Sequence, residues 1–334
     1  MRHAGMHWPT MAERPNRQAI TSLPGVQNGV LVILADSARF HYQRIRDEAP
    51  NCTVVWRALP RGDRLPAHLD WDADALADEC LNLWDEQPHD GTEWFTPLNE
   101  LQFPWESGEP EFTGFRTTAE RLGRLRLALR QRFANLGHDV RLIFPPWGPD
   151  QPNGRVDAPF LAADEWMAEA MAWDAIGMHV YSHLDGDPEH RGPRNVTRTH
   201  EVMRRLLTER FGEPGRVKPL IYTEMNANRD PGVDDGDMLR AAAGVCASDP
   251  NCLGYAYYIW ETEREHETIF NVFRNDARMA LFRDPPTVEP LEPSPPPTDV
   301  LAVRRELRRI ADKTDLTPGE LRQELLNVID QIEV

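Results

Sequence analysis

The stretch EWFTPLNELQF (Glu93–Phe103) is an apolar run that ends in an Asn-Glu pair, with aromatic and polar residues following at once. A buried strand that places a carboxylate beside an amide where it leaves the core is either a chance strand end or half of a catalytic pair. This run is one of eight short apolar runs that alternate with amphipathic helical stretches. Such alternation predicts βα units around a parallel sheet.

The eight strand candidates are five to eight residues long. They are Ala4–Trp8, Gly29–Ala35, Thr53–Leu59, Glu93–Asn99, Val140–Pro146, Ala175–Ser182, Pro219–Met225 and Leu253–Trp260. Eight strands close a (β/α)8 barrel, so the predicted fold is α/β, a (β/α)8 TIM barrel. A doubly wound open sheet is the alternative, because TMAERPNRQAITSLPG after the first strand is a poor helix. The chain lacks the glycine-rich phosphate loop usual after the first strand of that fold, which argues against it.

Two of the intervening helices can be predicted from their apolar spacing. The first carries, on one face, Leu122, Leu125, Leu129, Phe133 and Leu136. A capping box of Thr117 and Glu120 is expected at its start, and Gly137 at its C′ position. The second, THEVMRRLLTERFGEPG, is expected to end at Gly212 and to turn inward Met203, Leu206, Leu207 and Phe211.

The character of the sequence changes after Arg283. DPPTVEPLEPSPPPTD is typical of a proline-rich, semi-rigid spacer, and the residues beyond it predict two short helices. The chain is therefore divided into a catalytic barrel (1–283), a linker (284–298) and a helical tail (299–334). About 35 residues bury little core by themselves, so we expect the tail to dock or self-associate rather than bind a dedicated partner.

Composition excludes several partners. A net charge of -17 argues against nucleic acid, which would require a basic stripe. No apolar run approaches the roughly 20 residues that span a bilayer, so no membrane partner is expected. The start, MRHAGMHWPT, lacks the apolar segment of a secretory leader, which leaves the location open.

The four cysteines form no CxxC pair and show no metal-ligand spacing. Cys246 and Cys252 flank the turn-rich segment ASDPN, so they are either a local disulfide or two buried thiols.

The strand ends carry the candidate chemistry, since active sites of (β/α)8 barrels lie at the C-terminal ends of the strands. Glu100 follows the fourth strand and Glu224 ends the seventh, on opposite sides of the barrel mouth. His179 and Tyr181 are two apart and share one side of the sixth strand. Glycoside cleavage needs such a pair, one acid to protonate the leaving oxygen and one carboxylate to attack or to activate water.

Further residues near the strand ends suit a sugar. Asn99 could bond the sugar 2-hydroxyl, and Tyr181 or His179 could hold the attacking carboxylate. Trp260 could stack on a sugar face. Trp8, Trp105 and Trp147 are expected either to form an aromatic rim that contacts the sugar or to pack loops against the barrel.

This ordered set resembles glycoside hydrolase clan A and is most similar to the cellulase-like family five and its relatives, over roughly residues 4 to 283. The resemblance rests on the strand-end residues Asn99-Glu100, His179-x-Tyr181, Glu224 and Trp260.

It implies a retaining glycosidase with a carbohydrate substrate and no cofactor, Glu100 as general acid/base and Glu224 as nucleophile. It also implies an arginine near the nucleophile, which is either Arg57 in the third strand or Arg39 after the second.

Two other functions remain open. A non-catalytic glycan-binding barrel would keep the aromatic rim without needing both glutamates. A metal-dependent barrel hydrolase could use His179 and His183 with His7. The first strand, however, contains no HxH, and no strand-end aspartate completes that set, so no metal site is expected.

Overall fold

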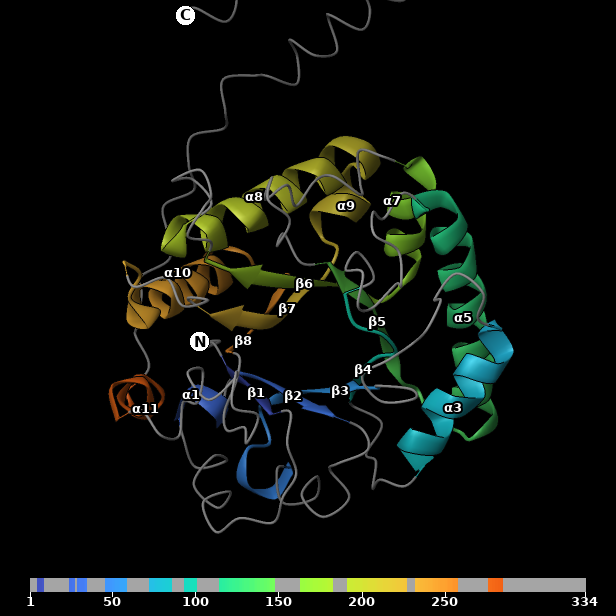
Figure 1. Ribbon diagram of the computed structural model, residues 1–334, viewed down its shortest axis with the longest axis horizontal. Coiled ribbons are helices and arrows are strands. Elements are labelled where there is room, and N and C mark those ends of the chain that lie inside the picture. The colour runs from blue at the N-terminus through green and yellow to red at the C-terminus, as the bar shows by residue number, and fades with distance from the viewer. Residues whose placement is uncertain are drawn as a thin grey trace, which may run out of the picture. The chain divides into compact units, whose positions relative to one another are not determined.

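Eight parallel strands close into a barrel in the computed structural model (Figure 1). It describes residues 5–8, 24–27, 29–34, 46–58, 72–85, 93–100, 114–147, 163–182, 191–226, 232–257 and 276–284. The strands are β1 (Gly5–Trp8), β2 (Val30–Leu34), β3 (Thr53–Arg57), β4 (Trp94–Thr96), β5 (Arg141–Trp147), β6 (Ala175–Tyr181), β7 (Leu220–Asn226) and β8 (Cys252–Tyr257). All eight predicted strands are confirmed. Because β1 pairs with both β2 and β8, the open-sheet alternative is wrong.

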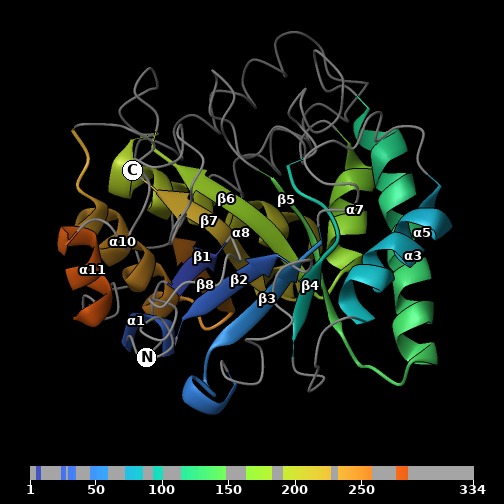
Figure 2. The ribbon, with the colours of Figure 1, turned by 60° about the horizontal axis from the view of Figure 1, so that its bottom comes forward.

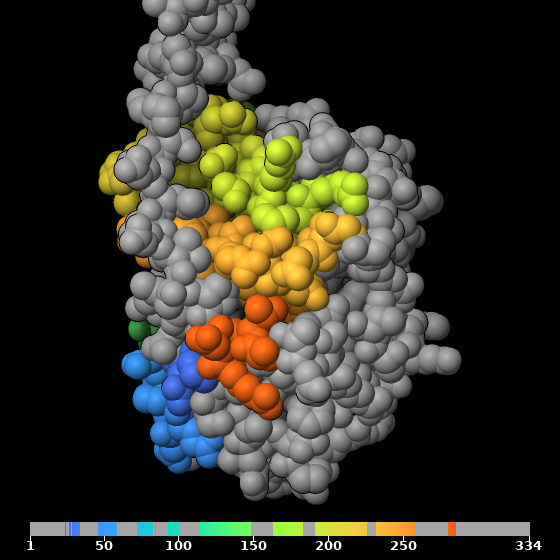
Figure 3. All heavy atoms as spheres, turned by 90° about the vertical axis from the view of Figure 1, so that its left-hand side faces the viewer, coloured from blue at the N-terminus to red at the C-terminus, as the bar shows by residue number. Residues whose placement is uncertain are grey.

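The helices lie outside the ring of strands, as Figures 1 and 2 show from two directions. They are α1 (Pro24–Gln27), α3 (Ala73–Asp85), α5 (Phe115–Asn135), α7 (Asp164–Ala172), α8 (Gly192–Phe211), α9 (Glu213–Arg216), α10 (Asp235–Ser248) and α11 (Asp276–Arg283). Figure 3 shows α8, α10 and α11 side by side on one face. Within the described ranges, no helix is both long and apolar enough to cross a membrane.

Strand alternation divides the core into two layers. Inward-facing residues fill the barrel itself with Val30, Val32, Val55, Trp94, Ile143, Ala175, Ile221 and Ala256. Their sequence neighbours, such as Leu31 and Val54, belong instead to the larger cluster shared with the helices. Successive side chains point to opposite sides of a strand. An apolar strand therefore supplies residues both to the barrel interior and to the layer between the strands and the helices.

Helix α5 confirms the predicted apolar face, with Leu122, Leu125, Leu129 and Phe133 buried. Leu136 is a correction, because it lies at the C-cap beyond the last turn and is 44% exposed. Gly137, at φ 76°, donates to the carbonyl of Ala134, and His138 donates to that of Phe133. These bonds form a Schellman motif, so the predicted C′ glycine is confirmed.

The predicted capping box at Thr117 and Glu120 is wrong. Helix α5 begins at Phe115, and its N-cap, Gly114, has no side chain to form a cap bond. The apolar face of α8 is confirmed for Met203, Leu206 and Leu207, and Phe211 is half-buried. Gly212 ends that helix at φ 62°, as predicted.

A set of polar side chains, which we call the base cluster, lies near the N-terminal ends of β7 and β8. It consists of His200, Arg204, Tyr222 and Asp249. The His200 ring nitrogens lie 3.1 Å from the Tyr222 hydroxyl and 2.9 Å from Asp249 Oδ2. Arg204 Nε donates to the same Oδ2 at 2.9 Å. Burial alone would raise the pKa of Asp249, but the His200 hydrogen bond and the Arg204 charge outweigh it and lower the pKa to about 2.

The segments predicted as linker (284–298) and tail (299–334) lie outside the described residues from 285 onward. Their roles stay predictions.

Candidate active site

The C-terminal ends of four strands bring charged and polar side chains together. We call this set the mouth cluster: Arg57 from β3, Glu100 after β4, His179 and Tyr181 from β6, and Glu224 from β7. Each of the five residues is at most 8% exposed. Since burying a charge is costly unless it is paired, the contacts among these residues decide what the cluster can do.

A β-bulge in β7 sets the direction of Glu224. The register with β6 passes from Met178–Tyr222 to His179–Glu224, so β7 contains one extra residue, Thr223. In a regular strand, Thr223 and Glu224 would point to opposite faces. Both nevertheless reach the same guanidinium, because the bulge turns both side chains inward.

Glu224 accepts hydrogen bonds on both of its carboxylate oxygens. Arg57 Nη1 donates to Oε1, and the Tyr181 hydroxyl donates to Oε2. Burial opposes the charge of Arg57, but the carboxylate of Glu224 outweighs it and raises the pKa of Arg57 above its ordinary value. The carboxylate of Glu224 is thus fixed in orientation beside a permanent cation.

His179 lies between the two glutamates and the arginine. Its Nδ1 is 2.7 Å from Glu100 Oε1 and 3.5 Å from Glu224 Oε2. Its Nε2 is 3.0 Å from Arg57 Nη2 and 2.9 Å from Thr223 Oγ1. A guanidinium only donates, so Nε2 accepts and the ring proton lies on Nδ1, the nitrogen nearer the two glutamates.

The shared nitrogen limits the separation of the two carboxylates. Glu100 Oε1 and Glu224 Oε2 can be no farther apart than the sum of 2.7 and 3.5 Å, which is 6.2 Å. Both glutamates therefore face one small volume, as the sequence predicts for opposite sides of a barrel mouth.

Two other predicted site residues, Asn99 and Trp147, lie within the described part of the chain. Asn99 is half-buried next to Glu100 in the chain. Trp147 is 5% exposed and packs against Phe115 and Trp166 at ring centroid distances of 5.8 and 5.7 Å, in the layer between strands and helices. This environment gives Trp147 a packing role.

Several predictions fall on residues outside the described part. Trp8 ends β1, but its side chain is not among the described ones. Trp105, Trp260, His183 and Arg39 lie outside the described residues. Of the two candidate arginines, Arg57 is therefore the one for which a contact with Glu224 is observed.

Two residues of the site had no role in the sequence prediction. Thr223 contacts both Arg57 and His179. Asn195, near the start of α8, donates from Nδ2 to the carbonyl of Tyr181 at 2.7 Å and so fixes the end of β6. A hydroxyl directly before the strand-end glutamate was visible in the sequence, whereas nothing in the helix pattern marked Asn195.

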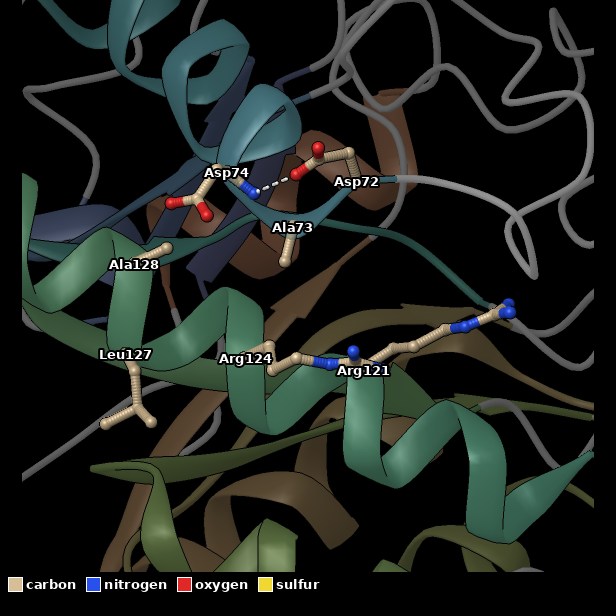
Figure 4. A pocket seen from close by; sticks show the side chains of 7 residues that line it. All are labelled: Asp72, Ala73, Asp74, Arg121, Arg124, Leu127 and Ala128. Atoms are coloured by element: carbon tan, nitrogen blue, oxygen red, sulfur yellow. Dashed lines mark hydrogen bonds between the residues drawn. The ribbon is translucent and has the colours of Figure 1, made fainter.

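A surface groove of about 660 Å³ lies elsewhere, between the start of α3 and α5 (Figure 4). It is lined by Asp72, Ala73, Asp74, Arg121, Arg124, Leu127 and Ala128. Asp72 Oδ1 accepts from the backbone N–H of Asp74 at 2.8 Å, so its carboxylate caps the helix. Asp74 in turn pairs with Arg132 at 3.0 Å. Asp72 and Asp74 therefore stabilise helices α3 and α5. The buried mouth cluster, rather than this groove, is the candidate active site.

No family model matches this sequence, and no curated protein matches it. Among solved structures, the chain is similar to a GH128 (subgroup II) endo-beta-1,3-glucanase from Sorangium cellulosum, with a TM-score of 0.54 and 14% identity, covering 85% of this chain and 99% of that chain. A weaker likeness is to the catalytic domain of a mannanase from Streptomyces sp. SirexAA-E, with a TM-score of 0.49 and 13% identity, covering 86% and 85%. At such identities the likeness concerns the fold, which is that of the clan A (β/α)8 glycoside hydrolases.

Proposed function

We propose that this protein is a retaining glycoside hydrolase that cleaves β-linked glycosidic bonds of a polysaccharide or oligosaccharide by double displacement. The observation that carries the proposal is the contact of Glu100 and Glu224 with one nitrogen of His179, which limits one pair of their oxygens to 6.2 Å, the sum of 2.7 and 3.5 Å. The bound supports a site that both carboxyl groups share, as carboxylate catalysis of glycoside cleavage requires, and the configuration of the first product separates retention from inversion.

In the first step, Glu224 attacks the anomeric carbon while Glu100 protonates the leaving oxygen. The bonds from Arg57 and Tyr181 hold Glu224 in orientation for that attack. His179 Nδ1 lies 2.7 Å from Glu100 Oε1, so we expect Oε2 of Glu100 to carry the proton that is transferred.

In the second step, Glu100, now a carboxylate, takes a proton from a water molecule. That water attacks the anomeric carbon and releases Glu224 from the ester. As Glu100 gives up its proton in the first step, two carboxylates come to face the sugar ring beside the single guanidinium of Arg57, and the cluster is net negative. A net negative site stabilises the positive charge that develops on the sugar ring.

The substrate class is a neutral β-glycan. A chain with a net charge of -17 tolerates such a substrate. The similar structure with a TM-score of 0.54 is that of an endo-beta-1,3-glucanase, so a β-1,3-glucan is the first substrate to test. Mannan and cellulose oligosaccharides complete the panel.

The decisive experiment compares the wild-type protein with Glu224→Gln and Glu100→Gln. We expect kcat for glycan hydrolysis to fall by at least about 10⁴-fold in Glu224→Gln, because the nucleophile is lost. For Glu100→Gln we expect a large loss on the glycan and a smaller one on an aryl glycoside whose leaving group needs no proton. The first product should keep the anomeric configuration of the substrate when followed by NMR.

Three results would contradict the proposal. Inverted product, or full activity in Glu224→Gln, would remove the double displacement. Wild-type protein that binds a glycan but hydrolyses none of the panel would indicate a glycan-binding barrel. Loss of wild-type activity on adding a chelator, with recovery on adding metal, would indicate a metal-dependent hydrolase.

A further inference from the structure

Two thiols lie next to each other at the end of the barrel opposite the mouth cluster. The Sγ atoms of Cys246 and Cys252 are 3.7 Å apart, and both residues are buried thiols. We propose that this pair is a modification site, a dithiol that a small-molecule disulfide such as oxidised glutathione converts to an intramolecular disulfide. The proposal is independent of the glycosidase function.

The backbone between the two cysteines is held in a fixed turn. Cys246 lies in the last turn of α10, and Cys252 is the first residue of β8. The N–H of Asp249 donates to the carbonyl of Val245 at 2.9 Å, and the N–H of Cys252 donates to the carbonyl of Asp249 at 3.0 Å. The N–H of Asn251 donates to Asp249 Oδ1 at 2.8 Å. These bonds keep both cysteines in place without a covalent link.

The same turn is anchored to its surroundings. Asp249 Oδ2 is held by His200 and Arg204 of α8, and the carbonyl of Asn251 accepts from the N–H of Leu220 at the start of β7. A disulfide has its sulfurs about 2.05 Å apart, so they must approach by about 1.6 Å. Rotation about the Cα–Cβ bonds can supply a movement of this size, which leaves the turn unchanged.

Burial assigns different roles to the two sulfurs. Cys246 is 8% exposed and Cys252 is fully buried. Burial, followed by the contact with Cys246, raises the pKa of Cys252 well above its ordinary value. Since the thiolate is the attacking species, Cys246 is the thiol that meets the oxidant, and Cys252 is the one that resolves the intermediate.

The exchange balances in two steps. The Cys246 thiolate attacks one sulfur of the oxidant, which forms a mixed disulfide and releases the first oxidant thiol. Cys252 then loses its proton and attacks the sulfur of Cys246, which releases the second thiol. Two protein thiols lose two electrons and two protons, and the oxidant disulfide is reduced to two thiols.

The other two cysteines provide an internal control. Cys52 Sγ lies 3.9 Å from the carbonyl oxygen of Thr53, and Cys80 Sγ lies 3.9 Å from that of Pro97. Burial raises the pKa of the Cys52 thiol to about 12 and also raises that of Cys80. We expect both to stay reduced under conditions that oxidise Cys246 and Cys252.

The test treats the reduced full-length protein with oxidised glutathione at pH 8, then blocks remaining thiols with iodoacetamide after denaturation. We expect a mass loss of two hydrogen atoms, alkylation of two of the four cysteines, and a peptide crosslink between residues 246 and 252 in a digest without reductant. The crosslink should raise the Tm by about 2–5 °C, because it closes a short loop in the unfolded chain. Dithiothreitol should reverse the change.

The variant Cys252→Ser distinguishes the two roles. It is expected to stop at a mixed disulfide of glutathione on Cys246, while Cys52→Ala should still form the crosslink. Alkylation of all four wild-type cysteines after long exposure would overturn the proposal. So would a crosslink that includes Cys52 or Cys80, or one that joins two chains.

Discussion

The mouth cluster and the base cluster are two buried polar networks built on a similar plan. In each, a histidine contacts a carboxylate, and an arginine lies beside them. The histidine is His179 in the mouth cluster and His200 in the base cluster. The base cluster balances one carboxylate, Asp249, against one guanidinium. The mouth cluster sets two carboxylates against one guanidinium.

This difference in the balance of carboxyl groups and guanidinium groups indicates two roles: the base cluster stabilises the fold, and the mouth cluster is the candidate catalytic site. In the base cluster, the charges of Asp249 and Arg204 oppose each other, and bonds join α8 to the turn before β8, to β7 and to the segment between α8 and β7. In the mouth cluster, one guanidinium faces two carboxyl groups, so a charge on the second carboxyl group would be costly to bury. A second titratable carboxyl group at the strand ends is expected of a site that transfers protons.

Among variants that keep both glutamates, the largest effect is expected from exchanging the guanidinium of Arg57 for an ammonium. Arg57→Lys keeps the charge but loses simultaneous contact with Glu224, His179 and Thr223. We expect kcat/KM on the glycan to fall about 10³-fold, roughly 4 kcal/mol. Arg204→Lys is the matched control and should lower stability while leaving kcat/KM of the folded enzyme near the wild-type value. Equal kinetic losses in both variants would contradict the division between the clusters.

The next effect concerns stability alone. Asp249→Ala removes the acceptor shared by His200 and Arg204 and leaves a partly buried guanidinium without its carboxylate. The free energy of unfolding, measured by urea denaturation, should fall by about 3 kcal/mol. Hydrolysis measured well below the Tm should be unaffected. A drop below 0.5 kcal/mol, on the order of an ordinary surface substitution, would show that the base cluster does not hold the fold.

A smaller loss of folding stability is expected when the pH is lowered. The pKa of Asp249 is about 2 in the folded protein and 3.8 in its ordinary state, so its ionised form stabilises the fold above pH 3.8. That contribution is lost as the pH falls through about 2. Allowing for partial exposure to solvent, we expect it to be about 1–2 kcal/mol. Asp249→Asn should lack this part of the wild-type pH dependence, which urea titrations between pH 5 and pH 2 would measure. Parallel curves for the two proteins would contradict the assignment.

The smallest effect tests the bulge residue. Thr223→Val keeps the shape of the side chain and removes the hydroxyl that contacts Arg57 and His179. We expect kcat/KM to fall about 10-fold, or 1.4 kcal/mol, with the loss mainly in kcat because orientation rather than binding is affected. Thr208→Val, near the end of α8, is a control in which a half-buried hydroxyl that donates to the carbonyl of Arg204 is removed. A change confined to KM would argue against a positioning role for Thr223.

Much of this architecture could be predicted from local pattern. Eight apolar runs and the spacing of Leu122 to Phe133 reflect periods of two and 3.6, which the backbone imposes on any chain. Leu136 and the capping box at Thr117 were wrong for one reason, that helix ends depend on where the last turn finds partners. Arg39 and Arg57 were indistinguishable by spacing, because distance along the chain does not report which strand ends meet.

The sequence by itself determined the barrel, its parallel order and the presence of Glu100 and Glu224 at strand ends, since periodicity and chain order are local properties. Tertiary structure alone decided that Glu224 faces inward together with Thr223, because a bulge depends on pairing with β6 rather than on residue type. It likewise placed His179 Nδ1 within 2.7 and 3.5 Å of the two glutamates and Cys246 Sγ within 3.7 Å of Cys252 Sγ. Such contacts arise only when separate strands and helices close around one core.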